Sequence, residues 1–406
     1  MATLTYAEFI AAPKPLPAGE INTIADTGSV IGSLTPGDFA AFAANNVNII
    51  DATDDAISLS RVQLDALGGV RFAAGDVVVF ADAGNAIDGM TPAALAALAA
   101  ANVDIIDATN DSMFLSTSQL EALGSVRLTA GDTVVLADTG AELASGALGQ
   151  ISTLAARNVD RIDVTDNVVP FSLAQLNALP VSLSPGDTVF LTDSGATLSS
   201  LGPSDLASLS ARGVVGFNAS DNVFTLSVSQ YQAFGAFQLA PEDIFKVNGT
   251  NASEQIDGRS SNDRIKGFGG NDRLNGNDGN DWLYGGAGKD VLTGGAGADA
   301  FVFDTKPNKK TNLDTVRDFN VRDDSVYLDN AIFKKLGKGS EANPGKLNKA
   351  FFKVADKAKD SNDYLIYNKK TGILYYDSDG SGGAQQVEIA KLSKNLKLTD
   401  KDFFVI

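Results

Sequence analysis

The sequence predicts a repeat protein, in which an N-terminal α/β solenoid of about four 56-residue repeats precedes a parallel β-roll and a mostly β C-terminal region. Three observations predict this fold class. A nine-residue pattern occurs six times between Gly249 and Val302. Earlier in the chain, short motifs recur at spacings of 56, 56 and 55 residues. Residues 1–245 hold 27 acidic and 7 basic residues, a net charge of −20, whereas residues 246–406 hold 23 and 25, a net charge of +2.

These observations divide the chain into four segments, with a boundary near Pro241–Val247. Fixed periods of this size are typical of arrays in which each unit buries its apolar face on its neighbours. The segments are residues 1–16, an N-terminal lead-in; residues 17–245, the 56-residue repeats; residues 246–303, the nonapeptide β-roll; and residues 304–406, a β-rich cap.

Two motifs mark each 56-residue repeat. The first is Ala25-Asp-Thr-Gly28, which recurs at residues 81–84, 137–140 and 192–195. The second is Ile50-Asp-Ala-Thr-Asp54, which recurs at residues 106–110 and 162–166 and, worn down, at 218–221. Each period splits into two halves of strand, turn and helix, a pattern that implies parallel strands with helical crossovers. A tandem array of small α/β or β-rich modules is the alternative.

Helix starts in these repeats carry capping signals. Thr91 is expected to cap a helix with Pro92 at its first position, where the missing N–H of proline costs nothing. Thr35-Pro36 and Ser184-Pro185 repeat this signal in part.

The recurring Asp residues of the two motifs have two interpretations. They cap turns and helix starts by accepting backbone N–H groups, or they bind a second set of calcium ions. Asp-Thr-Gly is also the motif of aspartic proteases, but here Ala or Ser replaces Thr and the apolar flanks of that catalytic loop are missing.

Each nonapeptide has a Gly-rich half and an Asp-x-apolar half. Glycine permits the positive φ angles of a tight turn, and the second half is a very short strand. Two nonapeptides complete one coil, so that the Asp residues line up along each edge. This G-G-x-G-x-D-x-U-x pattern is that of the calcium-binding parallel β-roll. The apolar residues expected to point into the roll are Ile256, Ile265, Leu274, Leu283, Leu292 and Phe301.

Calcium takes six to eight oxygen ligands, carboxylate or carbonyl, and these turns offer both. The predicted side-chain ligands are Asp263, Asp272, Asp281, Asp290 and Asp299. Turn positions expected to complete the calcium sites are Gly267, Gly269, Gly276, Asp278, Gly285, Gly286, Gly288, Gly294, Gly295 and Gly297. The first copy carries Glu254 in place of Asp. The alternative is a Gly/Asp-rich linker without metal. Five copies hold Asp and the apolar position in strict register, which argues against such a linker.

The composition excludes several function classes. The chain has no Cys and no His, which excludes disulfides, thiol chemistry, a Ser-His-Asp triad and an H-E-x-x-H zinc site. The acidic N-terminal part argues against nucleic-acid binding, which needs a basic face. No run of about 18 apolar residues is present, so no transmembrane segment is expected. Residues 1–14 lack a basic n-region and a long apolar core, so no cleavable N-terminal export signal is expected.

Motifs after the nonapeptides carry a family resemblance. They include Asp314-Thr-Val-Arg-Asp-Phe-Asn320, Gly372-Ile-Leu-Tyr-Tyr-Asp-Ser-Asp-Gly-Ser-Gly382 and the terminal Asp402-Phe-Phe-Val-Ile406. With the nonapeptides, residues 246–406 resemble the RTX family, the secreted bacterial repeats-in-toxin proteins, in the version found in calcium-binding proteins of rhizobia and related bacteria. The 56-residue repeats look like stretches of large alphaproteobacterial RTX surface proteins.

The resemblance implies that the tail caps the β-roll and carries an uncleaved signal for the type I secretion apparatus, to which the last five residues are similar. The physical argument agrees with this route. A Gly- and Asp-rich segment buries too little apolar surface to fold alone, so calcium binding would supply its folding free energy. Cytosolic calcium is far below the dissociation range of about 10⁻⁴–10⁻³ M of extracellular modules. The roll is therefore expected to stay open inside the cell and to fold outside.

One further loop fits the EF-hand pattern. It runs from Asp377 to Glu388 at the twelfth position. Its flanks read as strands, not helices, so we predict a β-hairpin with an Asp/Gly turn, and a single bound calcium is the alternative.

The predicted function is that of a secreted, non-enzymatic calcium-binding protein at the bacterial surface or in its matrix. Two repeat arrays without a catalytic constellation favour adhesion, layer assembly or polysaccharide contact. A carboxylate-based polysaccharide enzyme is one alternative, which would need two acids at a set separation. A membrane-active, toxin-like protein is another, which would need an amphipathic or apolar insertion segment.

Overall fold

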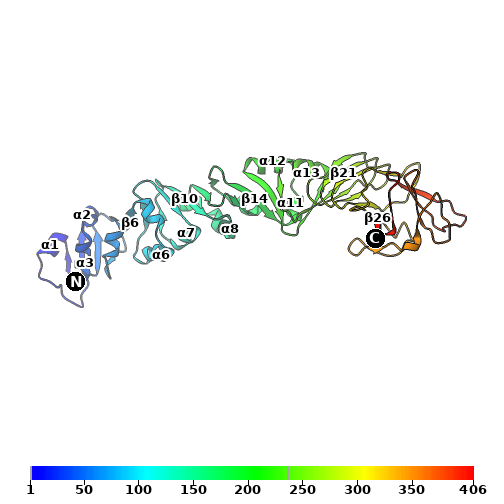
Figure 1. Ribbon diagram of the computed structural model, residues 1–406. Coiled ribbons are helices and arrows are strands. Elements are labelled where there is room, and N and C mark those ends of the chain that lie inside the picture. Colours follow the sequence, from blue (N-terminus) through cyan, green and yellow to red (C-terminus); the bar gives the residue numbers. More distant parts are fainter. Residues whose placement is uncertain (1, 236) are drawn as a thin grey trace. The chain divides into compact units, whose positions relative to one another are not determined.

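The structure is a computed structural model that describes residues 2–235 and 237–406, in two compact units, Met1–Phe190 and Leu191–Ile406 (Figure 1). The chain is rich in repeats, and its sheets are mostly parallel. Among the described residues, antiparallel pairs of named strands occur only after residue 340, where β27 (Gly345–Lys346), β29 (Leu365–Asn368), β30 (Ile373–Tyr376), β31 (Val387–Lys391) and β32 (Phe403–Val405) contribute to them.

The first unit holds three four-stranded parallel sheets. The first is ordered β1 (Ala2–Leu4), β2 (Asn22–Asp26), β3 (Ile49–Ala52), β5 (Arg71–Phe72). The second is ordered β4 (Ala56–Leu59), β6 (Val77–Asp82), β7 (Ile105–Ala108), β9 (Arg127–Leu128). The third is ordered β13 (Ser182–Leu183), β11 (Arg161–Val164), β10 (Thr133–Asp138), β8 (Ser112–Leu115). In addition, β12 (Val168–Val169) pairs with Thr188 and Val189 of β14 (Thr188–Asp193).

Short helices connect these strands. Those of the first unit are α1 (Tyr6–Ala11), α2 (Gly28–Gly32), α3 (Pro36–Ala44), α4 (Arg61–Asp65), α5 (Gly84–Asp88), α6 (Pro92–Ala100), α7 (Thr117–Ala122), α8 (Gly140–Ser145), α9 (Leu148–Ser152), η1 (Ala155–Arg157) and α10 (Leu173–Ala178). The capping signals place two of them correctly, because Thr91 caps α6 and Thr35 caps α3, each with proline in the first turn.

The helix start predicted at Ser184-Pro185 is wrong. The Ser184 carbonyl accepts a hydrogen bond from the Asp187 N–H at 3.1 Å, and Gly186 has a φ of 102°. Proline second and a left-handed glycine third make a tight turn before β14. The corresponding helix of the second unit, α12 (Pro203–Ala211), starts after Gly202 instead.

In each 56-residue repeat, one glutamine joins the second half-repeat to the first. In the second repeat, the Gln119 side-chain carbonyl accepts the Ser116 N–H at 2.8 Å, and its amide donates to the Asp88 and Met90 carbonyls, both at 2.8 Å. Both amide hydrogens and the amide oxygen therefore have partners, which offsets the cost of burying this side chain. Gln63, Gln175 and Gln230 repeat the arrangement.

The glycine of the first motif is required by a close approach of two backbones. The Gly84 N–H donates to Asn110 Oδ1 at 2.6 Å, and a Cβ on Gly84 would overlap the Ser112 carbonyl oxygen. Gly28, Gly140 and Gly195 meet the carbonyls of Ala56, Val168 and Val223 in the same way. The neighbouring strand therefore packs directly against this turn in every repeat.

The second unit contains two eight-stranded sheets that carry the nonapeptides. One is ordered β16 (Val223–Ser227), β18 (Ile244–Asn248), β20 (Asp263–Lys266), β22 (Trp282–Tyr284), β24 (Ala300–Phe303), β26 (Ser325–Leu328), β32, β27. The other is ordered β19 (Gln255–Asp257), β21 (Arg273–Asp278), β23 (Val291–Ala296), β25 (Asp314–Val316), β31, β30, β29, β28 (Phe352–Val354). Also present are β15 (Val214–Ala219), β17 (Gln238–Leu239), α11 (Gly195–Ser199), α13 (Val228–Ala233), η2 (Lys349–Phe351) and η3 (Asp400–Asp402).

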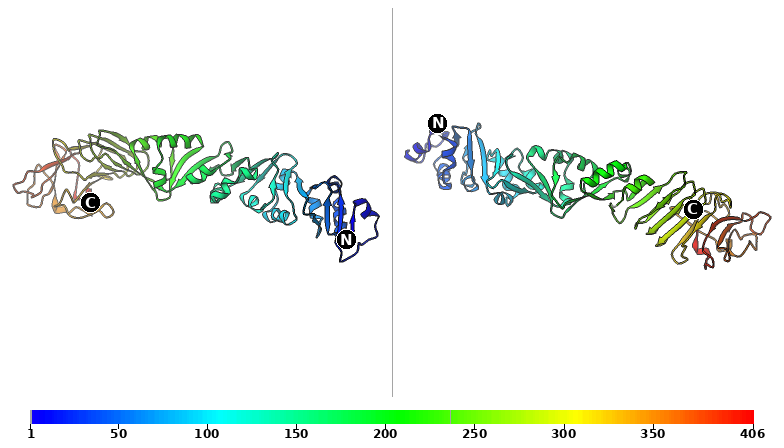
Figure 2. Two further views of the ribbon diagram at one scale, coloured as in Figure 1. Left: turned by 180° about the vertical axis from the view of Figure 1, so that it is seen from behind. Right: turned by 90° about the horizontal axis from the view of Figure 1, so that it is seen from above.

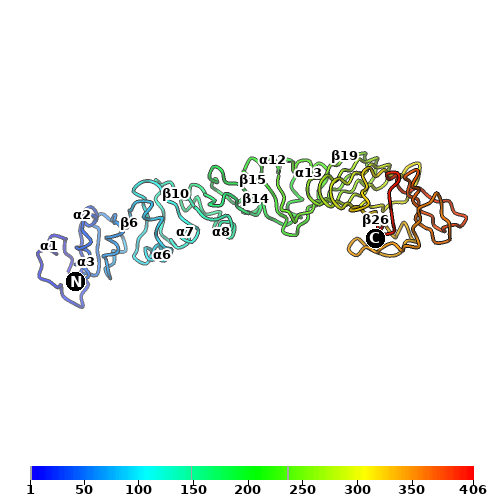
Figure 3. The backbone as a smooth tube through the Cα atoms, viewed as in Figure 1, coloured from blue at the N-terminus to red at the C-terminus, as the bar shows by residue number. Residues whose placement is uncertain are grey.

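The nonapeptides form coils of two units each, as predicted. Successive strands of each sheet pair in parallel in steps of 18 residues, for example Leu274 with Leu292 and Leu283 with Phe301. Figure 2 shows these strands side by side, and the tube in Figure 3 follows the coils. All six predicted inward residues are buried, at 2% exposure or less.

At the far end of the roll both sheets continue, because β25 pairs with β23 and β26 pairs with β24, whereas at the first end only one sheet continues and β19 is the edge strand of the other. At the first end, β18 pairs with β16 of the last 56-residue repeat and with β20 of the nonapeptides. In the tail, β30 and β31 form the antiparallel hairpin that the flanks of the Asp377 loop predict.

In the described part of the chain, no helix has the length and apolar character needed to cross a membrane.

Candidate calcium sites

Aspartates of the nonapeptides form two ladders, one along each edge of the roll. On one edge, Oδ1 of Asp281 accepts the N–H of Asp263 at 2.7 Å, and Oδ1 of Asp299 accepts the N–H of Asp281 at 3.0 Å. On the other, Asp272 and Asp290 accept the N–H groups of Glu254 and Asp272, both at 2.8 Å. Each carboxylate therefore caps the coil before it with one oxygen.

The other oxygen of four of these carboxylates has no partner. Oδ2 of Asp272, Asp281, Asp290 and Asp299 is buried without a hydrogen bond. Burial raises the pKa of Asp281 to about 7 and those of Asp272 and Asp299 to about 6, and it also raises the pKa of Asp290. A buried anionic oxygen without a partner raises the free energy of the folded state. A proton or a cation at each of these carboxylates would remove that cost.

Backbone carbonyls face the same spaces. A Cβ placed on Gly267 would meet the Gly285 carbonyl oxygen at 2.7 Å and also touch Oδ2 of Asp272. On the opposite edge, a Cβ on Gly276 would touch Oδ2 of Asp281 and lie 2.5 Å from the Gly294 carbonyl. Carboxylate and carbonyl oxygens converging between successive turns are the donor set that calcium prefers. The residues present therefore fit this ion.

In two copies of the nonapeptide, the carboxylate accepts hydrogen bonds from groups of its own turn. Oδ2 of Asp263 accepts the Arg259 N–H at 2.7 Å, and its Oδ1 accepts the Ser261 hydroxyl at 3.1 Å. In the degenerate first copy, the Glu254 carboxylate accepts the Thr250 N–H at 2.6 Å.

The backbone conformation of the turn decides whether a carboxylate keeps an unpartnered oxygen or accepts a hydrogen bond from its own turn. In the four copies with a free Oδ2, the second and fourth residues have positive φ angles: Phe268, Asn277, Gly286 and Gly295 at the second position, and Gly270, Gly279, Gly288 and Gly297 at the fourth. Arg259 and Thr250 do not, and their N–H groups reach the carboxylate. The sequence carries a signal for this difference, because Ser261 and Ala252 stand where the other copies have glycine.

Two further predicted positions have other roles. The Gly269 N–H donates to the Thr250 carbonyl at 3.1 Å, and Gly269 forms a parallel bridge with Ala287. Asp278 is exposed at the end of β21, where its charge contributes to the raised pKa of Asp281.

Sequence reasoning missed two members of the ladders. Oδ1 of Asp314 accepts the Asp290 N–H and Oδ1 of Asp324 accepts the Asp299 N–H, both at 3.0 Å. The Asp-x-apolar pattern could have found them, since Val316 and Val326 follow at the expected positions. Oδ2 of Asp324 is already used by the Asn320 N–H at 2.7 Å.

The ligands of any one ion would be mostly backbone oxygens. Within the described ranges, no three acidic side chains gather closely enough to hold a metal by themselves. Carbonyls of the glycine-rich turns would have to supply the rest.

The aspartates of the two 56-residue motifs act as caps in the structure. Asp54, Asp166 and Asp221 accept the N–H groups of Gly28, Gly140 and Gly195 at 2.7, 2.8 and 2.7 Å. Asp82 and Asp138 accept the N–H of the residue that follows each of them.

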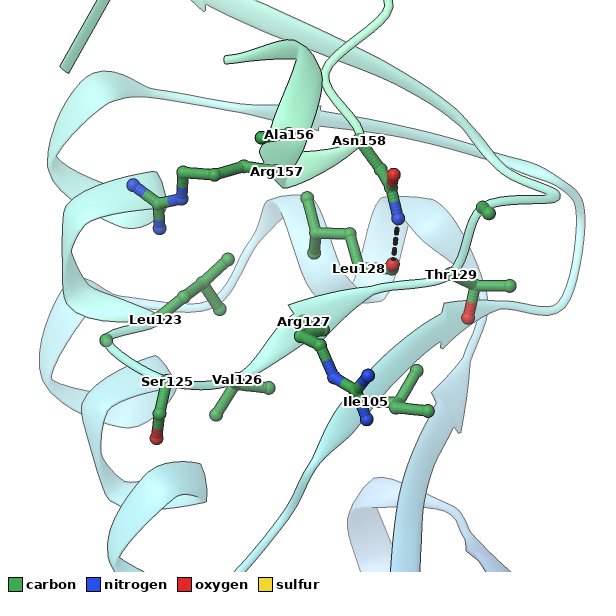
Figure 4. A pocket seen from close by; sticks show the side chains of 12 residues that line it. Ile105, Leu123, Ser125, Val126, Arg127, Leu128, Thr129, Ala156, Arg157 and Asn158 are labelled. Atoms are coloured by element: carbon green, nitrogen blue, oxygen red, sulfur yellow. Dashed lines mark hydrogen bonds between the residues drawn. The ribbon is translucent and has the colours of Figure 1, made fainter. Parts of the chain in front are cut away.

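The first unit also has a cavity of about 370 Å³ between β9 and η1 (Figure 4). Arg127, Leu128 and Asn158 line it, and the Arg157 guanidinium donates to the Leu120 carbonyl. Its described lining contains no acidic residue, so it holds none of the predicted ligands.

Comparison with known proteins identifies the nonapeptides. The family model of the RTX calcium-binding nonapeptide repeat (4 copies) matches residues 248–281 and 267–301. A search of curated proteins finds no match. Among solved structures, the chain is similar to the AlgE6R3 subunit of the Azotobacter vinelandii mannuronan C5-epimerase, with 25% identity and a TM-score of 0.26 over 38% of this chain and 79% of that one. It is also similar to the extracellular lipase LipA from Serratia marcescens, with 11% identity and a TM-score of 0.24 over 91% and 70%.

Proposed function

Because residues 248–301 are RTX calcium-binding nonapeptide repeats, we propose that this chain is a secreted, non-enzymatic calcium-binding protein of the bacterial cell surface or matrix. The observation that carries the proposal is the set of four buried carboxylates with one oxygen each left without a partner. Calcium at these oxygens would supply the free energy that folds the roll. Asp272, Asp281, Asp290 and Asp299 are the proposed side-chain ligands, and Asp263 instead completes its own turn.

The placement of the last residues supports export before folding. Strand β32 lies between β26 and β27, and Ile406 is 9% exposed. The terminal segment Asp402–Ile406 is proposed as the type I secretion signal of a rhizobial-type RTX protein. The secretion apparatus could read this segment only while β32 is not paired with β26 and β27.

We propose that the 56-residue repeats carry the specific binding function of the chain. We place residues 17–245 in an α/β solenoid of four repeats, preceded by the lead-in of residues 1–16 and followed by the roll of residues 246–303 and the cap of residues 304–406. A net charge of −20 over residues 1–245 suits contact with a surface or polysaccharide bridged by divalent cations.

Replacement of one ligand tests the calcium sites. Asp281→Asn keeps the hydrogen bond to the Asp263 N–H but removes the charge at Oδ2. A charged contact contributes about 1.5–3 kcal/mol, so the calcium concentration at half-saturation should rise roughly 10- to 100-fold in a calorimetric titration. Asp263→Asn is the matched control, because both oxygens of Asp263 already accept hydrogen bonds within its own turn, and it should raise that concentration less than Asp281→Asn does. Equal losses in both variants would contradict the proposed ligand set.

The surface role is tested by co-sedimentation of the intact protein with cells and with isolated exopolysaccharide. Binding should require calcium and should survive removal of unbound protein. New reducing ends or unsaturated sugars after incubation would instead favour a polysaccharide-acting enzyme. Binding to neither material would refute the surface role and leave the calcium sites untouched.

A further inference from the structure

Three aspartates outside the nonapeptides share the arrangement of the four proposed ligands. Asp76, Asp132 and Asp243 each end the turn that leads into β6, β10 or β18. Their exposures are 8%, 5% and 1%, so each side chain is more than nine-tenths buried. They stand 56 and 111 residues apart, at corresponding places of the 56-residue repeats.

Each of these carboxylates uses one oxygen to cap the preceding half-repeat. Oδ2 of Asp76 accepts the Ala52 N–H at 3.1 Å, and Oδ2 of Asp132 accepts the Ala108 N–H at 2.8 Å, each across 24 residues. Asp243 accepts the Ala219 N–H at 3.1 Å. In all three, Oδ1 is buried and has no hydrogen-bond partner. The nonapeptide ligands divide their two oxygens in the same way, across 18 residues.

The surroundings of these oxygens favour a cation. Burial is the main cause of the raised pKa of Asp76, and the nearby charges of Asp51 and Asp55 raise that pKa further. Around Asp132, Asp107 and Asp111 act in the same sense. Additional negative charge destabilises a bare carboxylate and attracts a divalent ion. A buried polar atom that lacks a partner also calls for an unseen ion or water.

We infer that Asp76 and Asp132 each bind a calcium ion, and that Asp243 marks a third site of the same kind. Carbonyl and water oxygens would complete each shell, since no three acidic side chains close on one point within the described residues. Asp187, the counterpart in the third repeat, is partly exposed and is not assigned. The inference rests on the proposed role of the same carboxylate arrangement in the nonapeptides.

Hydrogen exchange of the full chain, read by mass spectrometry with and without calcium at about 10⁻³ M, tests the inference. Calcium should slow exchange at least about tenfold in peptides that cover residues 50–56 and 73–78, and in those that cover 106–112 and 129–134. Asp76→Asn should abolish the effect in the first pair of peptides and leave it in the second. Asp104→Asn is the matched control, because Asp104 caps the Val78 N–H at 2.9 Å and has no buried oxygen that lacks a partner.

A second variant is needed because Asp76→Asn could change hydrogen exchange by destabilising the turn rather than by removing a calcium ligand. Asp51→Asn leaves the bond between Ala52 and Asp76 intact and should weaken the calcium effect at residues 50–56. Unchanged exchange in all four peptides, with a clear calcium response at residues 268–299, would overturn the inference while leaving the proposed function standing. Loss of response in Asp104→Asn as well would overturn it too.

Discussion

Removal of calcium from the intact protein with a chelator is expected to open the roll and to shift the fluorescence of Trp282 to longer wavelengths. Trp282 is the only tryptophan of the chain, and it follows the proposed ligand Asp281 directly. Its ring lies 4.5 Å from that of Tyr327 and 4.7 Å from the Arg264 guanidinium. These neighbours come from β20 and β26, so the environment of the indole depends on the pairing of several strands.

The expected effect is large because the free energy of calcium binding is comparable with the stability of a domain. One site held at 100 times its dissociation constant contributes about 2.7 kcal/mol. Four such sites together approach the net stability of about 5–15 kcal/mol of a typical protein. Without the ion, four buried oxygens also lack partners, which opposes folding further.

The control for chelation is the same chelator added with excess calcium, which should leave Trp282 unshifted. Re-addition of calcium should restore the original emission. Emission that is insensitive to calcium at every concentration would show that the roll folds without metal, and the calcium-dependent part of the proposed function would then be wrong.

Gly84→Ala is expected to cost the first unit about 3 kcal/mol or more, since the new methyl group overlaps the Ser112 carbonyl and two backbones must separate. For a unit of this size the thermal midpoint should fall by roughly 10 °C. The measurement is thermal unfolding followed by helical circular dichroism in the presence of calcium.

Gly75→Ala is the matched control for this substitution. A Cβ on Gly75 meets nothing within 4 Å, and its φ is not in the left-handed region. Alanine should therefore be neutral there or slightly stabilising, because it restricts the unfolded chain. Similar midpoints for the two variants would mean that the repeats are packed less closely than the structure shows.

The periodic features of the fold could be predicted from the sequence, because each rests on a local rule that repeats. Asp-x-apolar patterns locate the strands of the roll, and threonine before proline locates the starts of α3 and α6. Ser184-Pro185 misleads for a physical reason. The fixed φ of proline suits both the first turn of a helix and the second position of a tight turn, and only the following Gly186 decides between them.

Which carboxylate oxygens are free could not be predicted in the same way. That property depends on whether the N–H four residues earlier points at the carboxylate, as it does for Asp263 and not for Asp281. Nothing in the local sequence marks Asp76 and Asp132 as buried, because an Asp that follows Gly before a strand is compatible with an ordinary exposed turn. Their burial is set by the neighbouring half-repeat, 24 residues earlier, and a local pattern contains no information about it.

The pairing of β18 with both β16 and β20 has a consequence for how the roll acquires its structure. An isolated roll would have to form its first coil without a neighbour and would expose an unpaired strand edge, which invites aggregation. In this chain β18 is already paired with β16 on one side, so β20 can pair with its other side when calcium binds. We expect the last 56-residue repeat to act as a template for the growth of this sheet, whereas β19 is the edge strand of the other sheet of the roll.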